Sequence, residues 1–176
     1  MSKTIRTAIM ILLVSFIASL VYLKMSQNPI TDKSAKTIYD LTFVDSQDRQ
    51  FRLSELKGKI AVINFWATYC GPCRDEMPDL SNISDSYKDN NVVILGIASD
   101  EMNNVKEFLE TTKVSYRNVA AEFEAIDISN SLGNESNVLP FTVILAPEGN
   151  VLFRHAGRII PEKIREVVDL ALSKKE

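Results

Sequence analysis

Residues 60–78 read IAVINFWATYCGPCRDEMP, and this stretch decides the fold. Its first eight residues are apolar except for Asn64 and rich in β-branched and aromatic side chains, which predicts a buried strand. The run ends at Cys70-Gly71-Pro72-Cys73, and polar helix-forming residues follow. Proline suits the first turn of a helix, where its missing N–H needs no partner. The two cysteines are therefore expected where a strand gives way to a helix.

A thiol at this junction faces unpaired backbone N–H groups and the positive end of the helix dipole. Both stabilise a thiolate, so we expect Cys70 to have a lowered pKa and to act as the attacking sulfur. Cys73 lies three residues on, on the same helix face, close enough to close a disulfide with Cys70. The spacing predicts thiol–disulfide exchange, in which Cys70 attacks a substrate disulfide and Cys73 resolves the mixed disulfide.

Strand-like and helix-like segments alternate along the rest of the chain. Residues 41–44 and 50–53 flank a polar turn at 45–49 and predict a hairpin. Further strands are expected at 92–98, 116–119, 141–145 and 151–154, and helices at 72–88, around 105–109, at 123–132 and at 161–172. This order predicts an α/β fold with a central mixed β-sheet covered by helices on both sides.

The N-terminal part predicts a membrane anchor. Residues 7–23 carry no charge, which is at the short end of the roughly 17–25 residues of a transmembrane helix. Because the run exceeds the usual secretory core of about 7–15 residues, we interpret it as an uncleaved signal anchor, with a cleaved signal peptide as the alternative. Lys3 and Arg6 favour a cytoplasmic segment at 1–6. Residues 24–36 are then a linker, and residues 37–176 a domain outside the cytoplasm, in the periplasm if the cell is Gram-negative.

Composition narrows the classes of function. The formal net charge is −3, from 20 Lys and Arg against 23 Asp and Glu, which gives no support to nucleic-acid binding. Two cysteines and one histidine cannot supply the four ligands of structural zinc. Covalent haem attachment needs a histidine after the second cysteine, where this chain has Arg74. We expect no metal and no diffusible cofactor.

The motifs resemble a known superfamily. FWATYCGPC at 65–73 is similar to the active site of the thioredoxin superfamily, and RDEMP at 74–78 resembles the membrane-tethered TlpA/ResA-like thiol–disulfide oxidoreductases. The similarity continues in LPFTVIL at 139–145 and PEGNV at 147–151. It implies a thioredoxin-like fold at the inner membrane and reduction of protein disulfides, commonly in apocytochrome c or a related secreted protein. Electrons would come from a membrane thiol transporter, since the compartment outside is oxidising.

The resemblance also implies where substrate binds. By itself, Pro140 is a proline at the start of a strand, with the trans bond that most prolines have. The resemblance instead implies a cis Leu139-Pro140 bond that faces the cysteines, with nearby backbone available to pair with an extended substrate. The candidate substrate-binding residues are Trp66, Tyr69, Gly71, Pro72, Leu139 and Pro140, of which Trp66 is interpreted as scaffold beside the site.

Glu76 is the third candidate catalytic residue, with Cys70 and Cys73. It lies three residues after Cys73 and can share its helix face. In ResA-like proteins the glutamate at this place is linked to acid–base chemistry, and partial burial would raise its pKa and let it exchange a proton with Cys73. The alternative is a solvated carboxylate that favours the helix dipole. Asn64 stands where thioredoxins carry a buried aspartate, so the acid–base role of that position is vacant here.

The leading hypothesis is a disulfide reductase, because Gly-Pro between the cysteines is the arrangement of thioredoxin, a reductant at about −270 mV. An oxidant or isomerase would use the same two sulfurs. A copper-handling protein or a redox-inert adaptor is a hypothesis of another class, although the chain has no Met-rich or His-rich tract. His155, the only histidine, is expected to be a surface or packing residue.

Overall fold

The computed structural model describes residues 10, 12–13, 15–17, 19 and 38–173. The chain divides into two units, Met1–Thr31 and Asp32–Glu176. The described residues of the first unit are helical. Within the described parts, no helix has both the length and the apolar character needed to cross a membrane. The predicted cytoplasmic segment at 1–6 and the linker at 24–36 lie outside the described residues, as does much of the predicted anchor at 7–23, and these remain predictions.

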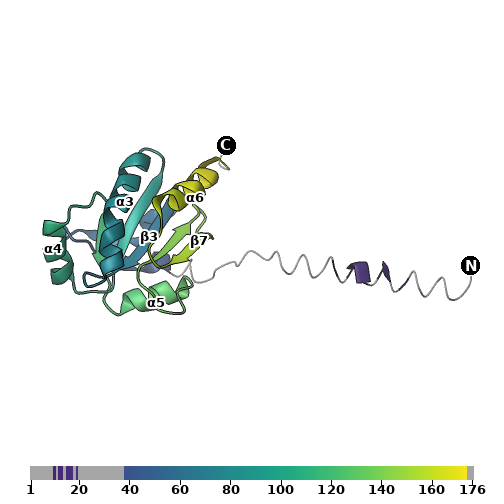
Figure 1. Ribbon diagram of the computed structural model, residues 1–176, viewed down its shortest axis with the longest axis horizontal. Helices are drawn as coiled ribbons and strands as arrows, with labels where there is room; N and C mark the ends of the chain where they lie inside the picture. The colour runs from purple at the N-terminus through teal and green to yellow at the C-terminus, as the bar shows by residue number, and fades with distance from the viewer. Residues whose placement is uncertain (1–9, 11, 14, 18, 20–37, 174–176) are drawn as a thin grey trace, which may run out of the picture. The chain divides into compact units, whose positions relative to one another are not determined.

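The second unit is built on a five-stranded sheet (Figure 1). The strand order is β5-β4-β3-β6-β7, with β3 parallel to β4, β4 parallel to β5, and β6 antiparallel to both β3 and β7. These strands are β3 (Ile60–Trp66), β4 (Val92–Ala98), β5 (Arg117–Ala120), β6 (Phe141–Leu145) and β7 (Val151–Ala156). The helices are α3 (Gly71–Tyr87), α4 (Met102–Thr111), α5 (Glu124–Ser131) and α6 (Pro161–Ser173). The mixed sheet of the predicted α/β class is confirmed.

The predicted N-terminal hairpin is also confirmed. Strands β1 (Thr42–Val44) and β2 (Gln50–Arg52) pair in antiparallel register. They lie between two short 3-10 helices, η1 (Ile38–Asp40) and η2 (Leu53–Leu56).

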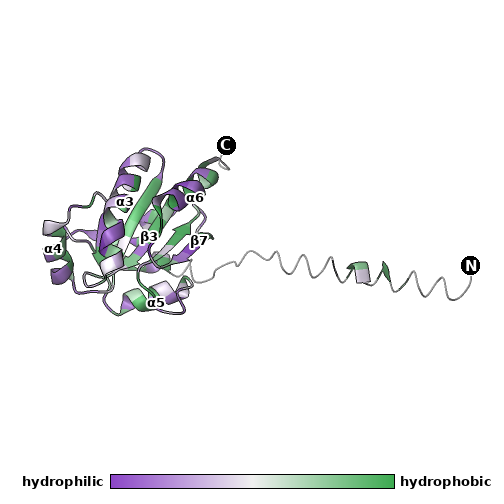
Figure 2. Cartoon of the chain, viewed as in Figure 1, coloured by the Kyte–Doolittle hydropathy of each residue, from purple (hydrophilic) through white to green (hydrophobic). Residues whose placement is uncertain are grey.

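Two hydrophobic clusters sandwich the sheet, because successive side chains of a strand point to opposite faces. One face of β3 carries Ala61, Ile63 and Phe65, which pack with residues of the hairpin, η1, η2 and α5. The other face packs with α3, α4 and α6. The central strand is hydrophobic along most of its length, whereas the helices carry polar residues as well (Figure 2).

Strand β3 is the centre of the fold. All seven of its residues are buried, which explains why its sequence is almost continuously apolar instead of alternating. Asn64 is the single polar residue of the strand and is fully buried. It lies on the same face as Val62 and Trp66, the face that α3 covers. A polar side chain is thereby placed under the helix that begins at the cysteines.

Candidate active site

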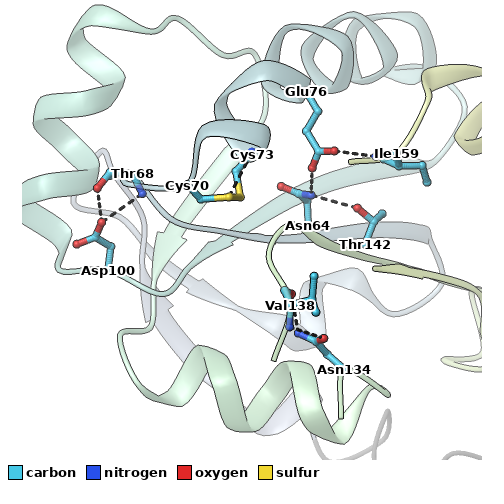
Figure 3. The surroundings of a disulfide bond; sticks show 10 residues. All are labelled: Asn64, Thr68, Cys70, Cys73, Glu76, Asp100, Asn134, Val138, Thr142 and Ile159. Carbon is cyan, nitrogen blue, oxygen red and sulfur yellow. Dashed lines mark hydrogen bonds between the residues drawn. A yellow bond between two sulfur atoms is a disulfide. The ribbon is translucent and has the colours of Figure 1, made fainter. Parts of the chain in front are cut away.

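The cysteine pair lies at the junction of β3 and α3, as predicted. Cys70 is the N-cap residue of α3, with an extended backbone (φ −87°, ψ 104°), and Pro72 follows in the first turn. The Cys73 N–H donates to Sγ of Cys70 at 3.3 Å. The two residues form a disulfide, with an S–S distance of 2.06 Å (Figure 3). The sulfur of Cys70 thus lies where backbone N–H groups are free to stabilise negative charge.

The two sulfurs differ in access to solvent. Cys73 is on the buried face of α3, with 0% of its surface exposed, whereas Cys70 is partly exposed. A folded partner protein can reach only the exposed sulfur. The burial therefore supports Cys70 as the group that attacks and Cys73 as the group that resolves.

Glu76 is fully buried on α3, one turn after Cys73. Its Oε1 accepts a hydrogen bond from Asn64 Nδ2 at 2.7 Å, and its Oε2 accepts one from the Ile159 N–H at 3.0 Å (Figure 3). Burial raises the pKa of Glu76 to about 7, although the hydrogen bonds from Ile159 and Asn64 and the charge of Arg158 oppose the rise. The alternative of a solvated carboxylate is wrong. With a pKa of about 7, the carboxyl group is partly protonated at neutral pH.

Asn64 connects Glu76 to the neighbouring strand. Its Nδ2 also donates to Thr142 Oγ1 at 3.1 Å, because Asn64 and Thr142 are paired across β3 and β6. Its Oδ1 is buried and has no hydrogen-bond partner among the described residues. A buried acceptor of this kind costs about 1–3 kcal/mol when it has no donor. The amide of Asn64 thus holds the carboxylate of Glu76.

The Leu139-Pro140 peptide bond is cis, as the resemblance implied. Strand β6 begins one residue later at Phe141, which pairs with Phe65 of β3. Because β3 and β6 are antiparallel neighbours, the start of β6 lies beside the end of β3. The cis bond is therefore at the same end of the sheet as the start of the cysteine loop. Among the described residues, no hydrogen bond uses the backbone N–H or C=O of Leu139, whereas the Pro140 carbonyl accepts from Gly157.

Two buried or half-buried polar side chains hold the loops of the site, and sequence reasoning missed both roles. Asp100, which follows β4, accepts hydrogen bonds from the side chain and N–H of Thr68, two residues before Cys70. Asn134 is 3% exposed and clamps the loop before the cis bond, since it accepts from the Val138 N–H and donates to the Val138 carbonyl, both at 3.0 Å. Figure 3 shows both clamps beside the disulfide. No sequence signal marks Asn134.

The remaining predicted residues divide into surface and interior. Tyr69 is 73% exposed, Pro72 is exposed and Gly71 is partly exposed. Trp66 is fully buried and packs its ring against Phe108 with centroids 5.5 Å apart, which fits scaffold and leaves no surface for direct contact with substrate.

Other side chains with ligand chemistry lie apart from this site. His155 lies in β7 and its Nε2 is 3.1 Å from the Arg158 carbonyl, and within the described residues it makes no hydrogen bond to a cysteine or to Glu76. In the part of the chain that the structure describes, no group of three or more His, Cys, Asp or Glu residues is arranged to hold a metal ion.

Known proteins are similar to this chain in sequence and in fold. The Redoxin family profile matches residues 31–170. The thiol-disulfide oxidoreductase ResA of Geobacillus kaustophilus is 31% identical over 166 residues, which cover 90% of each chain. The ResA of Bacillus subtilis is 26% identical over 94% of this chain and 91% of its own. A thioredoxin-family thiol:disulfide interchange protein of Chlorobium tepidum superposes with a TM-score of 0.67 at 27% identity, over 75% of this chain and 92% of that chain. The chain therefore belongs to the Redoxin family, as a ResA-like thiol–disulfide oxidoreductase of the thioredoxin superfamily.

Proposed function

We propose that this oxidoreductase works as a reductant of protein disulfides outside the cytoplasm, tethered to the inner membrane by residues 7–23. The observation that carries the proposal is the asymmetry of the pair. The sulfur of the partly exposed Cys70 accepts a hydrogen bond from the Cys73 N–H at the start of α3, whereas Cys73 is fully buried. An attacking thiolate and a shielded resolving thiol are what thiol–disulfide exchange with a large substrate needs, and Gly71-Pro72 between the two cysteines favours reduction.

The exchange balances as two displacements. In the reduced enzyme, the Cys70 thiolate attacks one sulfur of the substrate disulfide, and the other substrate sulfur leaves as a thiolate and takes a proton from water. The thiol of Cys73 then loses its proton and attacks Sγ of Cys70, and the second substrate sulfur leaves. Two electrons pass to the substrate, and the enzyme ends with the Cys70–Cys73 disulfide.

Glu76 is the proton acceptor in the second displacement. Its pKa of about 7 leaves it partly ionised at neutral pH, and it lies three residues after Cys73 on the same helix. A general base works best when its pKa lies near the working pH.

The direction of electron flow follows from the motif and its compartment. Gly71-Pro72 between the cysteines is the thioredoxin arrangement, which is reducing at about −270 mV. In an oxidising compartment the enzyme needs a supply of electrons, so its partner on the donor side is a membrane thiol transporter. Its acceptors are secreted proteins that carry disulfides, such as an apocytochrome c. The backbone N–H and C=O of Leu139 make no hydrogen bond within the described residues, so they can pair with an extended substrate.

The test of direction is the reduction potential of the pair. The protein is equilibrated in buffers of defined thiol–disulfide ratio, and the fraction reduced is measured by thiol alkylation. We expect a value near that of thioredoxin, about −270 mV, whereas a value near −120 mV would make the protein an oxidant. Insulin reduction with dithiothreitol as donor is the companion assay, and Cys70→Ser is expected to abolish it.

The test of substrate and location uses the cell. Cys73→Ser leaves Cys70 unable to release its partner, so mixed disulfides accumulate and are identified after non-reducing electrophoresis. Recovery of a c-type cytochrome precursor supports the pathway, and the Cys70→Ser/Cys73→Ser double variant is the matched control. Labelling of Cys70 in intact cells by a thiol reagent that does not cross the inner membrane supports the location, and labelling only after lysis contradicts it.

A further inference from the structure

A small pocket lies between α5 and the residues that directly precede Cys70 and the cis proline. Its volume is about 110 Å³, and its lining includes Phe65, Tyr69, Ile126 and Leu139. Tyr69 directly precedes the attacking Cys70, and Leu139 directly precedes the cis proline. The residue before the attacking sulfur and the residue before the cis proline thus share this pocket. Nothing in the exchange reaction itself uses it.

Large apolar side chains are exposed around the pocket. Tyr69 is 73% exposed, Phe123 83%, Ile126 37% and Val138 38%. Phe123 and Ile126 are three residues apart at the start of α5 and are neighbours on its surface. Val138 is next to Leu139 in the loop that Asn134 holds. We call these five residues, Tyr69, Phe123, Ile126, Val138 and Leu139, the α5 platform. An exposed apolar cluster beside a reactive group is typical of a surface that binds another protein.

The rim of the platform is acidic. Residues 118–153 contain five acidic residues and no Lys, Arg or His. Four of the acidic residues, all exposed, lie in α5 or within four residues of its ends: Glu122, Glu124, Asp127 and Glu135. Two basic residues of other elements bear on this surface. Arg154 of β7 donates from Nε to the Leu132 carbonyl at the far end of α5, and Arg74 lies on α3 directly after Cys73.

The helix dipole explains only part of this charge. Glu124 and Asp127 lie in the first turn of α5, where carboxylates are favourable. Glu122 and Glu135 lie outside the helix, and Glu122 has a positive φ of 45°. The first turn of α5 therefore accounts for two of the four carboxylates, and burial of apolar surface does not account for the exposed Phe123. Acidic groups around an apolar centre favour a partner with the complementary pattern.

We infer that the α5 platform binds a basic polypeptide segment, with an apolar side chain near its disulfide seated in the pocket and Lys or Arg residues paired with the acidic rim. This inference rests on the proposed function and names its substrate class. A second copy of this chain is a poor occupant, because the chain carries a net charge of −3 and two acidic rims would repel. Attraction between opposite charges raises the rate of encounter and falls with salt.

The test compares peptide disulfides of equal length and equal apolar content that differ only in flanking residues, Lys in one and Glu in the other. Each peptide is joined through its disulfide to a fluorophore that carries the leaving thiol. The reduced full-length protein is mixed with the peptide, and release of the fluorophore on attack by Cys70 is followed by stopped flow. At low salt we expect the Lys peptide to react on the order of tenfold faster or more than the Glu peptide. The difference should shrink as salt is added.

A charge-neutral variant of the rim, E122Q/E124Q/D127N/E135Q, should lose the preference while it reduces a small neutral aromatic disulfide at the wild-type rate. The matched control neutralises four exposed carboxylates far from α5 in the sequence and should keep the preference: D85N/D89N/E107Q/E110Q.

Three results would overturn the inference: equal rates with the two peptides, equal loss of preference in the rim and control variants, or a dimer of wild type that Phe123→Ser dissociates. The small disulfide separates this failure from failure of the proposed function, because an enzyme that is not a reductase reduces neither the peptides nor the small disulfide.

Discussion

Replacing Glu76 with Gln tests the electrostatics of the site directly. The pKa of Glu76 is about 7 against an ordinary value of 4.5, because the carboxyl group is buried. One pKa unit corresponds to about 1.36 kcal/mol of free energy. The shift therefore implies that ionised Glu76 destabilises the folded protein by roughly 3 kcal/mol relative to its protonated form.

The direction of the pH dependence follows from where the proton is held more tightly. The folded protein keeps the proton of Glu76 up to about pH 7, whereas an unfolded chain releases it near pH 4.5. Between these values the folded state binds more protons, so the free energy of unfolding falls as the pH rises. Below pH 4.5 Glu76 is protonated in both the folded and the unfolded state, and above pH 7 it is ionised in both. Outside this window its contribution to the free energy of unfolding does not change with pH.

Gln keeps the shape of Glu76 and removes its titration. Its amide oxygen can accept from the Ile159 N–H, and its amide nitrogen can donate to Asn64 once that amide rotates. We expect the free energy of unfolding of wild type to fall by roughly 3 kcal/mol relative to Glu76→Gln between about pH 4.5 and pH 7. Urea unfolding of the disulfide form at several pH values measures both curves.

The matched control is Asp75→Asn on the same helix, where the carboxylate is exposed. This variant should follow the wild-type curve within about 0.5 kcal/mol, as exposed charges contribute little. If wild type and Glu76→Gln instead give parallel curves over this window, Glu76 titrates as an ordinary carboxyl group and the reasoning is refuted.

Two further predictions concern the scaffold of the site. A Cβ added at Gly96 of β4 would lie 1.9 Å from the buried Asn118 Oδ1, so Gly96→Ala should lower the free energy of unfolding by about 1–3 kcal/mol. Gly71→Ala, where nothing lies within 4 Å of the added Cβ, should leave thermal unfolding nearly unchanged, and equal losses would contradict the packing argument. Asn134→Ala removes both hydrogen bonds to Val138 and should cost about 1–3 kcal/mol. It should also slow reduction of a peptide disulfide more than reduction of a small aromatic disulfide, and an equal effect on the two would show that the loop does not position substrate.

The location of the redox pair was predictable because its causes are local. An apolar run of strand-forming residues, a Gly-Pro turn and polar helix formers occupy one continuous stretch, and they place Cys70 at the N-cap of α3 whatever the rest of the chain does. The alternation of strands and helices was predictable for the same reason, since each element is encoded by the periodicity of its own residues.

The environment of Glu76 was not predictable in this way. The sequence left a solvated and a buried carboxylate as alternatives, because the partners of Glu76 lie 12 and 83 residues away, in β3 and before α6. The clamp of Asp100 on Thr68 likewise joins residues 32 apart. The pKa of an acid depends on which atoms displace water around it, and only the packed sheet brings those atoms together.

The sequence by itself therefore determined the fold class, the redox pair and the place of the pair at a helix start, since these depend on neighbours along the chain. The tertiary structure decided which sulfur is exposed, how Glu76 is buried and what surface surrounds the disulfide. Burial, desolvation and surface charge are properties of groups that meet across the sheet, and spacing along a single chain does not report them.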